Sequence, residues 1–307
     1  MVTLLLSHKA DVEAKDGALA TAIHYACQAG HHSTVDALLS KKANVEALGP
    51  EGASPLSWAC AYGAVHVVEL LIKRKASVKH KDHLGYTPLH YACSKGQAEV
   101  IELLLEKRAS IDARDSSGRT PLHLSLLVGS FAASELLLRK GAWIEAHCAG
   151  QARSLHYACL AKSLDLVQLV SGHGVQLEAE SQQGRAIHIA TRDGSTPIVE
   201  FLIRQGADFE VREKQGDRPL SIACAWGHLD LVKLFLNSGA ALRAKFAKGP
   251  SHEDSPLCIA SEFGHLPIVL ELLERGASVR QRDEKNWQPL RYAAYHGFPD
   301  IVEVLLE

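Results

Sequence analysis

Hydrophobic and polar positions along the chain repeat with a period close to 33 residues. The alignment rests on a short motif whose clearest copy is Thr-Pro-Leu-His at residues 87–90. The last position of this motif recurs after four steps of 33 residues and then after steps of 32, 33, 37 and 33. These anchor positions are His24, Ser57, His90, His123, His156, His188, Ser221, Cys258 and Arg291. A fixed period of this length indicates a stacked array of equivalent units and not a single compact globule.

Each period predicts a hairpin of two short helices. A Thr-Pro pair such as Thr87-Pro88 predicts the start of the first helix, because the threonine hydroxyl accepts from a free amide and proline fits the first turn. Eight of the nine periods carry a glycine six residues after the anchor, which predicts the end of that helix. Apolar residues then occupy more than one stripe of the second helix, as at 100–105. We therefore expect slabs that are apolar on both faces and stable only when stacked.

This set of motifs resembles the ankyrin repeat, and the resemblance covers the whole chain. It rests on Thr-Pro-Leu-His-Tyr-Ala at 87–92, the turn at Gly96, the apolar run 100–105 and tails such as Gly-Ala-Asp at 206–208, in that order. The resemblance implies an all-α solenoid of about nine ankyrin-type repeats with projecting hairpin loops, elongated and curved. We expect one array over 1–307, with a partial repeat at 1–15 and repeats at 16–48, 49–81, 82–114, 115–147, 148–180, 181–212, 213–249, 250–282 and 283–307.

Composition narrows the function classes. The chain has 33 Lys plus Arg against 35 Asp plus Glu, a formal charge of -2 and 47% apolar residues. These values argue against a disordered chain and against a protein that binds nucleic acid through its phosphates. There is no apolar run of about 18 residues and no secretory signal pattern. We expect a soluble intracellular protein that is cytoplasmic, with the nucleus as the alternative, and no membrane insertion.

The seven cysteines invite a metal or redox interpretation, but the repeat phase opposes it. Five of them lie three residues after an anchor. Equivalent positions on stacked helices are roughly 8–10 Å apart, beyond the about 7 Å limit for a disulfide, and a straight row does not converge on a zinc ion. We interpret these five as buried core thiols. Cys148 and Cys258 are outside the row, and we expect Cys148, in a predicted loop, to be the more reactive.

The anchor histidines fall in the first turn of a helix, where the helix dipole disfavours the charged imidazolium. We expect them to be neutral hydrogen-bonding groups, and the resemblance implies that they link neighbouring repeats. Ser57, Ser221, Cys258 and Arg291 put that link in doubt locally. No metalloprotease, phosphate-loop, nucleophile-elbow or dinucleotide motif is present. We expect no catalysis, no cofactor and no metal.

A binding surface is expected where exposed residues do not repeat. By resemblance, the variable contact positions are the hairpin tips and the exposed end of the first helix, on the concave side. Trp226, Phe263 and Tyr295 place aromatic residues there in three successive repeats, which is typical of binding hot spots. The alternative is that they pad the first helix against the second. The candidate partner-binding residues are Tyr62, Tyr86, Lys95, Arg192, Trp226, Glu262, Phe263, Trp287, Tyr295 and His296.

Two further features of the surface leave alternatives open. Leu127-Val128 and Leu160-Ala161 would form an exposed apolar patch or belong to ordinary core. Acidic residues twenty-two positions after the anchor could orient a basic peptide, although solvated surface is the preferred interpretation. They are Glu46, Asp112, Glu145, Glu178 and Glu210.

Some repeats depart from the pattern. The fifth has Arg153-Ser154 in place of Thr-Pro and Lys162 in place of the turn glycine, so residues 148–190 are predicted to be the softest joint. The four-residue excess at 246–254 predicts an enlarged loop beside the aromatic positions. Neither end shows a polar capping repeat, from which we expect the chain to be an excerpt of a longer protein.

The sequence predicts a non-catalytic interaction module or scaffold that binds a protein or peptide on its concave face. One alternative is a regulatory or substrate-recruiting array of a larger enzyme or signalling protein, whose other domains would then be its partners. Another is self-association through uncapped ends. A nucleic-acid partner is not expected at this net charge.

Overall fold

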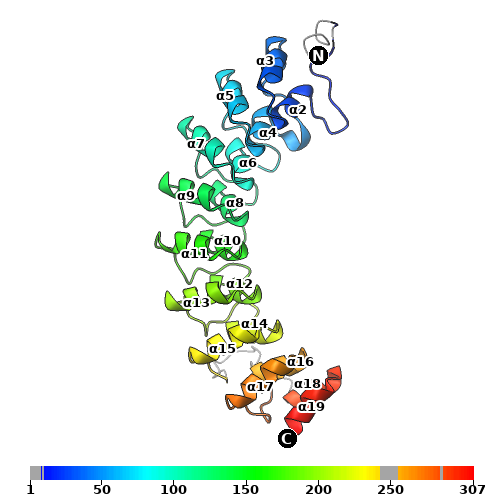
Figure 1. Cartoon of the computed structure of the whole chain (residues 1–307), viewed down its shortest axis with the longest axis vertical. Coiled ribbons are helices and arrows are strands. Elements are labelled where there is room, and N and C mark those ends of the chain that lie inside the picture. The colour runs from blue at the N-terminus through cyan, green and yellow to red at the C-terminus, as the bar shows by residue number, and fades with distance from the viewer. Residues whose placement is uncertain (1–7, 9, 243–254, 284–285) are drawn as a thin grey trace. The chain divides into compact units, whose positions relative to one another are not determined.

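The computed structural model describes residues 8, 10–242, 255–283 and 286–307. These residues form eighteen α-helices, a 3-10 helix η1 (Pro50–Gly52) and no β-strand (Figure 1). The first helices of the hairpins are α2 (Ala22–Gln28), α4 (Pro55–Ala61), α6 (Pro88–Ser94), α8 (Pro121–Leu127), α10 (Ser154–Leu160), α12 (Ala186–Arg192), α14 (Pro219–Ala225), α16 (Pro256–Glu262) and α18 (Pro289–His296). The second helices are α3 (His32–Ser40), α5 (Val65–Lys73), α7 (Ala98–Glu106), α9 (Phe131–Arg139), α11 (Leu164–Ser171), α13 (Thr196–Arg204), α15 (Leu229–Asn237), α17 (Leu266–Glu274) and α19 (Pro299–Leu306).

The expected all-α repeat solenoid is confirmed. Every full repeat predicted from the sequence contains one first and one second helix. The chain divides into two compact units, residues 1–161 with 168–175 and residues 162–167 with 176–307. Within each unit, first helices pack against first helices and second helices against second helices. The boundary between the units passes through α11, inside the repeat that matches the pattern least well.

Glycine at the end of the first helix is required for two reasons, a positive φ angle and the close approach of a histidine ring. Gly194 and Gly227 adopt positive φ angles of 72° and 76°. A β-carbon at these positions would lie 2.7 Å from the ring of His228 and 2.8 Å from the ring of His265, respectively. Both histidine rings come from the following repeat and donate back through Nε2, to the carbonyl oxygens of Arg192 and Ala225 at 3.2 and 3.1 Å. Glycine therefore permits both the turn and the close approach of the next repeat.

Two of the anchor histidines, His24 and His90, link successive repeats as expected. In His24, His90, His123 and His188 the Nδ1 atom accepts from the backbone amide three residues earlier, which assigns the proton to Nε2. The Nε2 atom of His24 and His90 then donates to a carbonyl oxygen 29 residues on, in the following repeat, whereas that of His123 and His188 donates to one 23 residues on, at the end of the same repeat. The acceptors are Ala53 at 3.2 Å, Arg119 at 3.2 Å, Ala146 at 3.0 Å and Val211 at 3.1 Å. Burial lowers the pKa of all four, that of His123 to about 4.

Where the anchor is not histidine, the link varies. Cys258 keeps it, because its Sγ atom lies 3.8 Å from the carbonyl oxygen of Trp287, twenty-nine residues on, as the acceptors of His24 and His90 are. Ser57 turns instead to the Ser54 hydroxyl at 3.2 Å in its own helix cap. The hydroxyl of Ser221 is buried with no hydrogen-bond partner in the described part of the chain. The doubt raised by the sequence is therefore justified at the two serines.

The acidic residues twenty-two positions after the anchor form a second set of links between repeats. In four of the five, one carboxylate oxygen accepts from a backbone amide about 31 residues further on. These bonds run from Ser77 to Glu46 at 2.6 Å, from Trp143 to Asp112 at 2.9 Å, from Asp208 to Glu178 at 2.9 Å and from Ala241 to Glu210 at 2.8 Å. The solvated-edge interpretation is therefore incomplete, because these carboxylates hold neighbouring hairpins in register.

The cysteines are core residues. All seven are free and buried, and burial raises the pKa of Cys27 to about 12. The expectation of an accessible Cys148 is wrong: it is 9% exposed and hydrogen-bonded to Tyr157. Cys148 takes the hairpin position that Asp82 holds two repeats earlier, where the carboxylate accepts from the Tyr91 hydroxyl at 2.6 Å. The thiol therefore replaces a buried acceptor.

The fifth repeat is strained where the sequence indicated. Lys162 has a φ of 55°, a conformation that costs a non-glycine residue about 1 kcal/mol, and Arg153 provides no side-chain cap. We expect amides in 148–190 to exchange faster than those of the third and seventh repeats. Changing Lys162 to Gly is expected to raise stability by about 1 kcal/mol and to slow that exchange, because the strain is removed. Hydrogen-exchange mass spectrometry would test both, and equal protection in all repeats would contradict the soft joint.

Candidate protein-binding site

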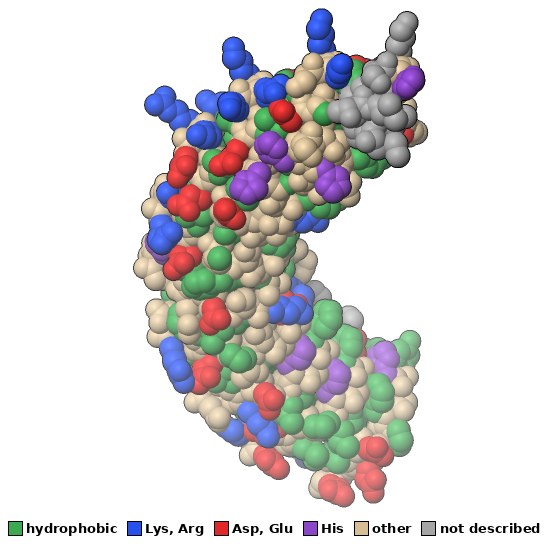
Figure 2. Space-filling view, turned by 45° about the horizontal axis from the view of Figure 1, so that its top comes forward, with side chains coloured by type: hydrophobic (Ala, Val, Ile, Leu, Met, Phe, Trp, Pro, Cys, Tyr) green, Lys and Arg blue, Asp and Glu red, His purple; other side chains and the backbone are tan. Residues whose placement is uncertain are grey.

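Three aromatic side chains lie exposed at the ends of successive first helices in the C-terminal unit. Trp226, Phe263 and Tyr295 are 60%, 53% and 73% exposed. They follow or end α14, α16 and α18, which pack side by side. Side chains that padded the first helix against the second would be covered, so the padding alternative does not fit these exposures. Figure 2 shows hydrophobic side chains and histidines gathered on this part of the molecule.

Trp287 joins this group through ring contacts. Its ring centroid lies 5.6 Å from that of Tyr295 in an edge-to-face arrangement and 4.9 Å from that of Tyr292. The guanidinium of Arg291 lies 4.0 Å from the Trp287 centroid, within cation–π range. The Trp287 amide donates to Asp283 at 2.8 Å. Trp287 is half-buried and held from several sides, so little side-chain entropy would be lost on binding.

We call Trp226, Phe263, Trp287 and Tyr295 the aromatic ridge. Its rim is polar: Glu262 is half-buried beside Phe263, and His296 is exposed with its ring 5.0 Å from that of Tyr295. Below it, the Tyr292 hydroxyl donates to Asp283, and burial together with this bond raises the Tyr292 pKa. The hydrogen bond between Tyr292 and Asp283 thus holds the hairpin that carries Trp287 and Tyr295.

The remaining candidates are less uniform. Arg192 is half-buried and bound by both carboxylate oxygens of Glu213, at 2.9 and 2.8 Å. Tyr86 is half-buried, and its hydroxyl accepts from Arg119 at 2.7 Å while its ring stacks on His90. Both side chains are therefore engaged in holding hairpin loops. Tyr62, 56% exposed, and Lys95, also exposed, lie in the N-terminal unit.

The apolar patch considered in the fourth and fifth repeats is exposed in the fourth. Leu127 and Val128 are 40% and 48% exposed, whereas Leu160 is half-buried. Trp143, which the sequence analysis did not single out, is 52% exposed, with the Arg114 guanidinium 5.9 Å from its ring centroid. Trp143 lies outside the contact positions that the resemblance implies, so the register did not point to it. Its only sequence signal is that it is a tryptophan.

The enlarged loop predicted at 246–254 lies outside the described residues. In the part of the chain that is described, no three His, Cys, Asp or Glu side chains come together as a metal site would require. None of the helices described there is long and apolar enough to cross a membrane.

Stacked helix hairpins of this kind define an all-α helical-repeat protein. The sequence profile of the family described as ankyrin repeats (three copies) matches residues 1–82, 67–148, 155–246 and 242–307. The chain belongs to the ankyrin repeat family. Ankyrin repeats generally mediate protein–protein interaction and are typically non-catalytic.

Relatives share short segments with this chain. An E3 ubiquitin-protein ligase, KEG, from Arabidopsis thaliana is 36% identical over 75 residues, which cover 24% of this chain and 5% of the ligase. Human protein phosphatase 1 regulatory subunit 27 is 36% identical over 55 residues, covering 18% of this chain and 36% of that protein. The crystal structure of the human ASB11 ankyrin repeat domain superposes with a TM-score of 0.65 at 23% identity, covering 72% of this chain and 98% of that one. The alignments thus span a minor part of the curated relatives' length, and the structural likeness concerns the fold.

Proposed function

We propose that this chain is a non-catalytic scaffold or interaction module that binds a protein or peptide through the aromatic ridge, on the side expected to be concave. The observation that carries the proposal is the exposure of Trp226, Phe263 and Tyr295 at the ends of three adjacent first helices. Leaving three large aromatic rings more than half in water is unfavourable unless a partner covers them.

The ridge favours a partner segment with apolar or aromatic side chains. Arg291 beside Trp287 and Glu262 beside Phe263 supply opposite charges at the rim, which would fix the orientation of the bound segment. His296 adds a hydrogen-bonding group next to Tyr295. Tight packing on the rings with a polar rim is the arrangement of residues that dominate binding energy.

The combined change of Trp226, Phe263 and Tyr295 to Ala is expected to abolish capture of the partner, with an affinity loss of at least about 100-fold. The measurement is a pull-down followed by titration calorimetry with the captured protein. A matched control changes Leu48, Leu84 and Phe131 to Ala, which removes three exposed apolar side chains from the other unit. Circular dichroism should show both variants as helical as the parent. Equal loss in the control, or no loss in the ridge variant, would remove the support for this site.

A second candidate function is that of a regulatory or substrate-recruiting array within a larger enzyme or signalling protein. It is favoured by two relatives whose names state such contexts, a ubiquitin ligase and a phosphatase regulatory subunit. An intracellular location, cytoplasmic or nuclear, belongs to either proposal and is supported by the seven free, buried thiols. Fractionation of cells carrying a tagged chain would test the location.

A further inference from the structure

Lys and Arg side chains cluster at the ends of four successive second helices in the N-terminal unit. We call this set the basic edge, and Figure 2 shows it as cationic side chains along one border of the N-terminal part. The helices are α3, α5, α7 and α9, which pack in that order. The basic edge consists of the exposed residues Lys41, Lys42, Lys73, Arg74, Lys75, Lys107, Arg108, Arg139 and Lys140.

Three residues of the basic edge adopt a left-handed backbone conformation that is unfavourable for any residue except glycine. Lys42, Lys75 and Arg108 have φ angles of 70°, 72° and 63°. The equivalent positions of the following repeats hold glycine, as at Gly141 and Gly206 with φ of 87° and 91°. Attraction of cations to the helix dipole does not account for this choice, because the neighbouring residue at each helix end is already basic. The strain therefore indicates that the side chains at these three positions serve another purpose.

Most of the basic edge is not neutralised by the protein itself. Arg74 pairs with Asp36 at 2.5 Å and Lys140 with Glu102 at 3.3 Å. Among the described residues, no acidic side chain pairs with the other seven cations. The partnerless cations are Lys41, Lys42, Lys73, Lys75, Lys107, Arg108 and Arg139.

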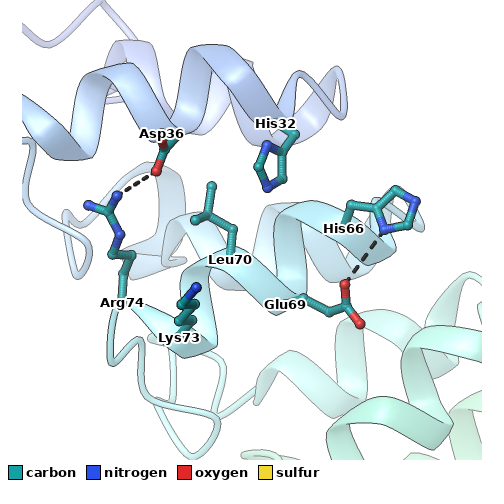
Figure 3. Close-up of a pocket in the computed structure, with 7 residues that line it drawn as sticks. All are labelled: His32, Asp36, His66, Glu69, Leu70, Lys73 and Arg74. Carbon is teal, nitrogen blue, oxygen red and sulfur yellow. Dashed lines mark hydrogen bonds and ion pairs between the residues drawn. The ribbon is translucent and has the colours of Figure 1, made fainter.

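A polar hollow of about 480 Å³ opens beside the edge, between α3 and α5 (Figure 3). Two acidic residues line it: Asp36 pairs with Arg74, and Glu69 lies 3.6 Å from the ring of His66, which carries a charge only when protonated. Lys73 also lines the hollow and has no acidic partner there. The hollow therefore holds two acidic and two basic side chains, and Lys73 is the cation among them without an ion-pair partner in the described part of the chain.

We infer that the basic edge binds an extended acidic peptide segment that carries Asp or Glu at every third residue. Equivalent positions on packed helices recur about every 8–10 Å. A chain in the polyproline-II conformation advances about 3.1 Å per residue with three residues per turn, so every third side chain returns to the same face after about 9 Å. One carboxylate would then meet the cations of each repeat in turn. This surface is separate from the aromatic ridge and does not depend on it.

The spacing favours such a peptide over nucleic acid. Every nucleotide of a duplex strand carries a phosphate, about 3.4 Å from the next along the axis. A row of cations with a period near 10 Å therefore matches the strand equally well in every register.

The probe is a fluorescent 15-residue peptide with Glu at every third position, compared with a peptide of the same composition whose Glu residues are contiguous. Binding is measured by anisotropy at low and physiological salt. The test variant changes Lys42, Lys75 and Arg108 to Gly. We expect about tenfold weaker binding of the spaced peptide by this variant, together with a Tm higher by roughly 3–6 °C, because glycine relieves the left-handed strain. The control changes Lys79, Lys214 and Arg280 to Gln, which removes the same charge elsewhere, and it should keep the affinity.

The inference is overturned if both peptides bind equally, if the glycine variant binds as the parent does, or if the control loses affinity equally. A lower Tm of the glycine variant would also overturn it, because the cations would then be explained by stability. Phosphatidylserine vesicles and a single-stranded oligonucleotide serve as further probes. Binding of either that exceeds binding of the spaced peptide would replace the inference with a membrane or nucleic-acid surface.

Discussion

Acidification from about pH 7 to about pH 4.5 is expected to lower the free energy of unfolding by more than about 2 kcal/mol. His123 has a folded pKa of about 4 against 6.5 when unfolded, so the unfolded chain binds more protons over this window. The stabilisation is complete above the unfolded value and is lost as the pH falls toward the folded one. His24, His90 and His188 shift in the same direction for the same reason, burial, and add to the loss. Urea denaturation followed by circular dichroism at several pH values measures it.

A pair of variants separates this effect from general acid denaturation. Changing His123 to Ser is expected to weaken the protein at about pH 7, because the Thr120 amide and the Ala146 carbonyl lose their partner, but to reduce the pH dependence. Changing His66 to Ser should leave the dependence intact, because that side chain is 87% exposed. Stability that does not change between about pH 7 and about pH 5 would contradict the buried neutral histidines.

Changing Phe235 to Ala is expected to destabilise the C-terminal unit by about 3–5 kcal/mol. Phe235, in α15, is fully buried, and its ring lies 6.3 Å from that of Phe209. Stability in a repeat array is a sum of repeat and nearest-neighbour terms, so the loss should fall on the repeats around α15. Limited proteolysis in increasing urea, with the fragments identified by mass spectrometry, should show cleavage within 176–307 before cleavage within 1–161.

The matched control is Phe263 changed to Ala. This side chain is 53% exposed, so its removal should alter stability by less than about 0.5 kcal/mol while weakening partner binding through the aromatic ridge. If the Phe235 variant unfolds in both units at the same urea concentration, the array is a single cooperative block. That result would contradict the independence of distant repeats.

The fold could be predicted from the sequence because the same stacking requirement is imposed nine times. Proline at the start of the first helix, glycine at its end and apolar residues on both faces of the second helix are local signals, and repetition makes them unambiguous. The acidic row was harder to interpret. Glu46 is an ordinary surface residue in sequence terms, and only the structure shows its carboxylate accepting from the amide of Ser77 in the next repeat.

The surface could be predicted only in part. Trp226, Phe263 and Tyr295 were identified from their register, and the structure adds their exposure. Arg192 has the same register but is held by Glu213, a partner 21 residues away that spacing does not reveal. The basic edge was missed because its signal is a backbone angle: Lys42 and Lys75 are unusual only once their φ angles are known. The burial of Cys148 likewise depends on the fold around Tyr157.

Each buried thiol can report the local opening of the repeat that carries it. A thiol reagent attacks the thiolate, and Cys27, Cys60 and Cys93 are buried with raised pKa values, so they react only when the surrounding helices part. These three mark the first three full repeats, while Cys159 and Cys224 mark the fifth and seventh. The rate at which each thiol is alkylated therefore measures how often its repeat opens. The native chain needs no added label for this measurement.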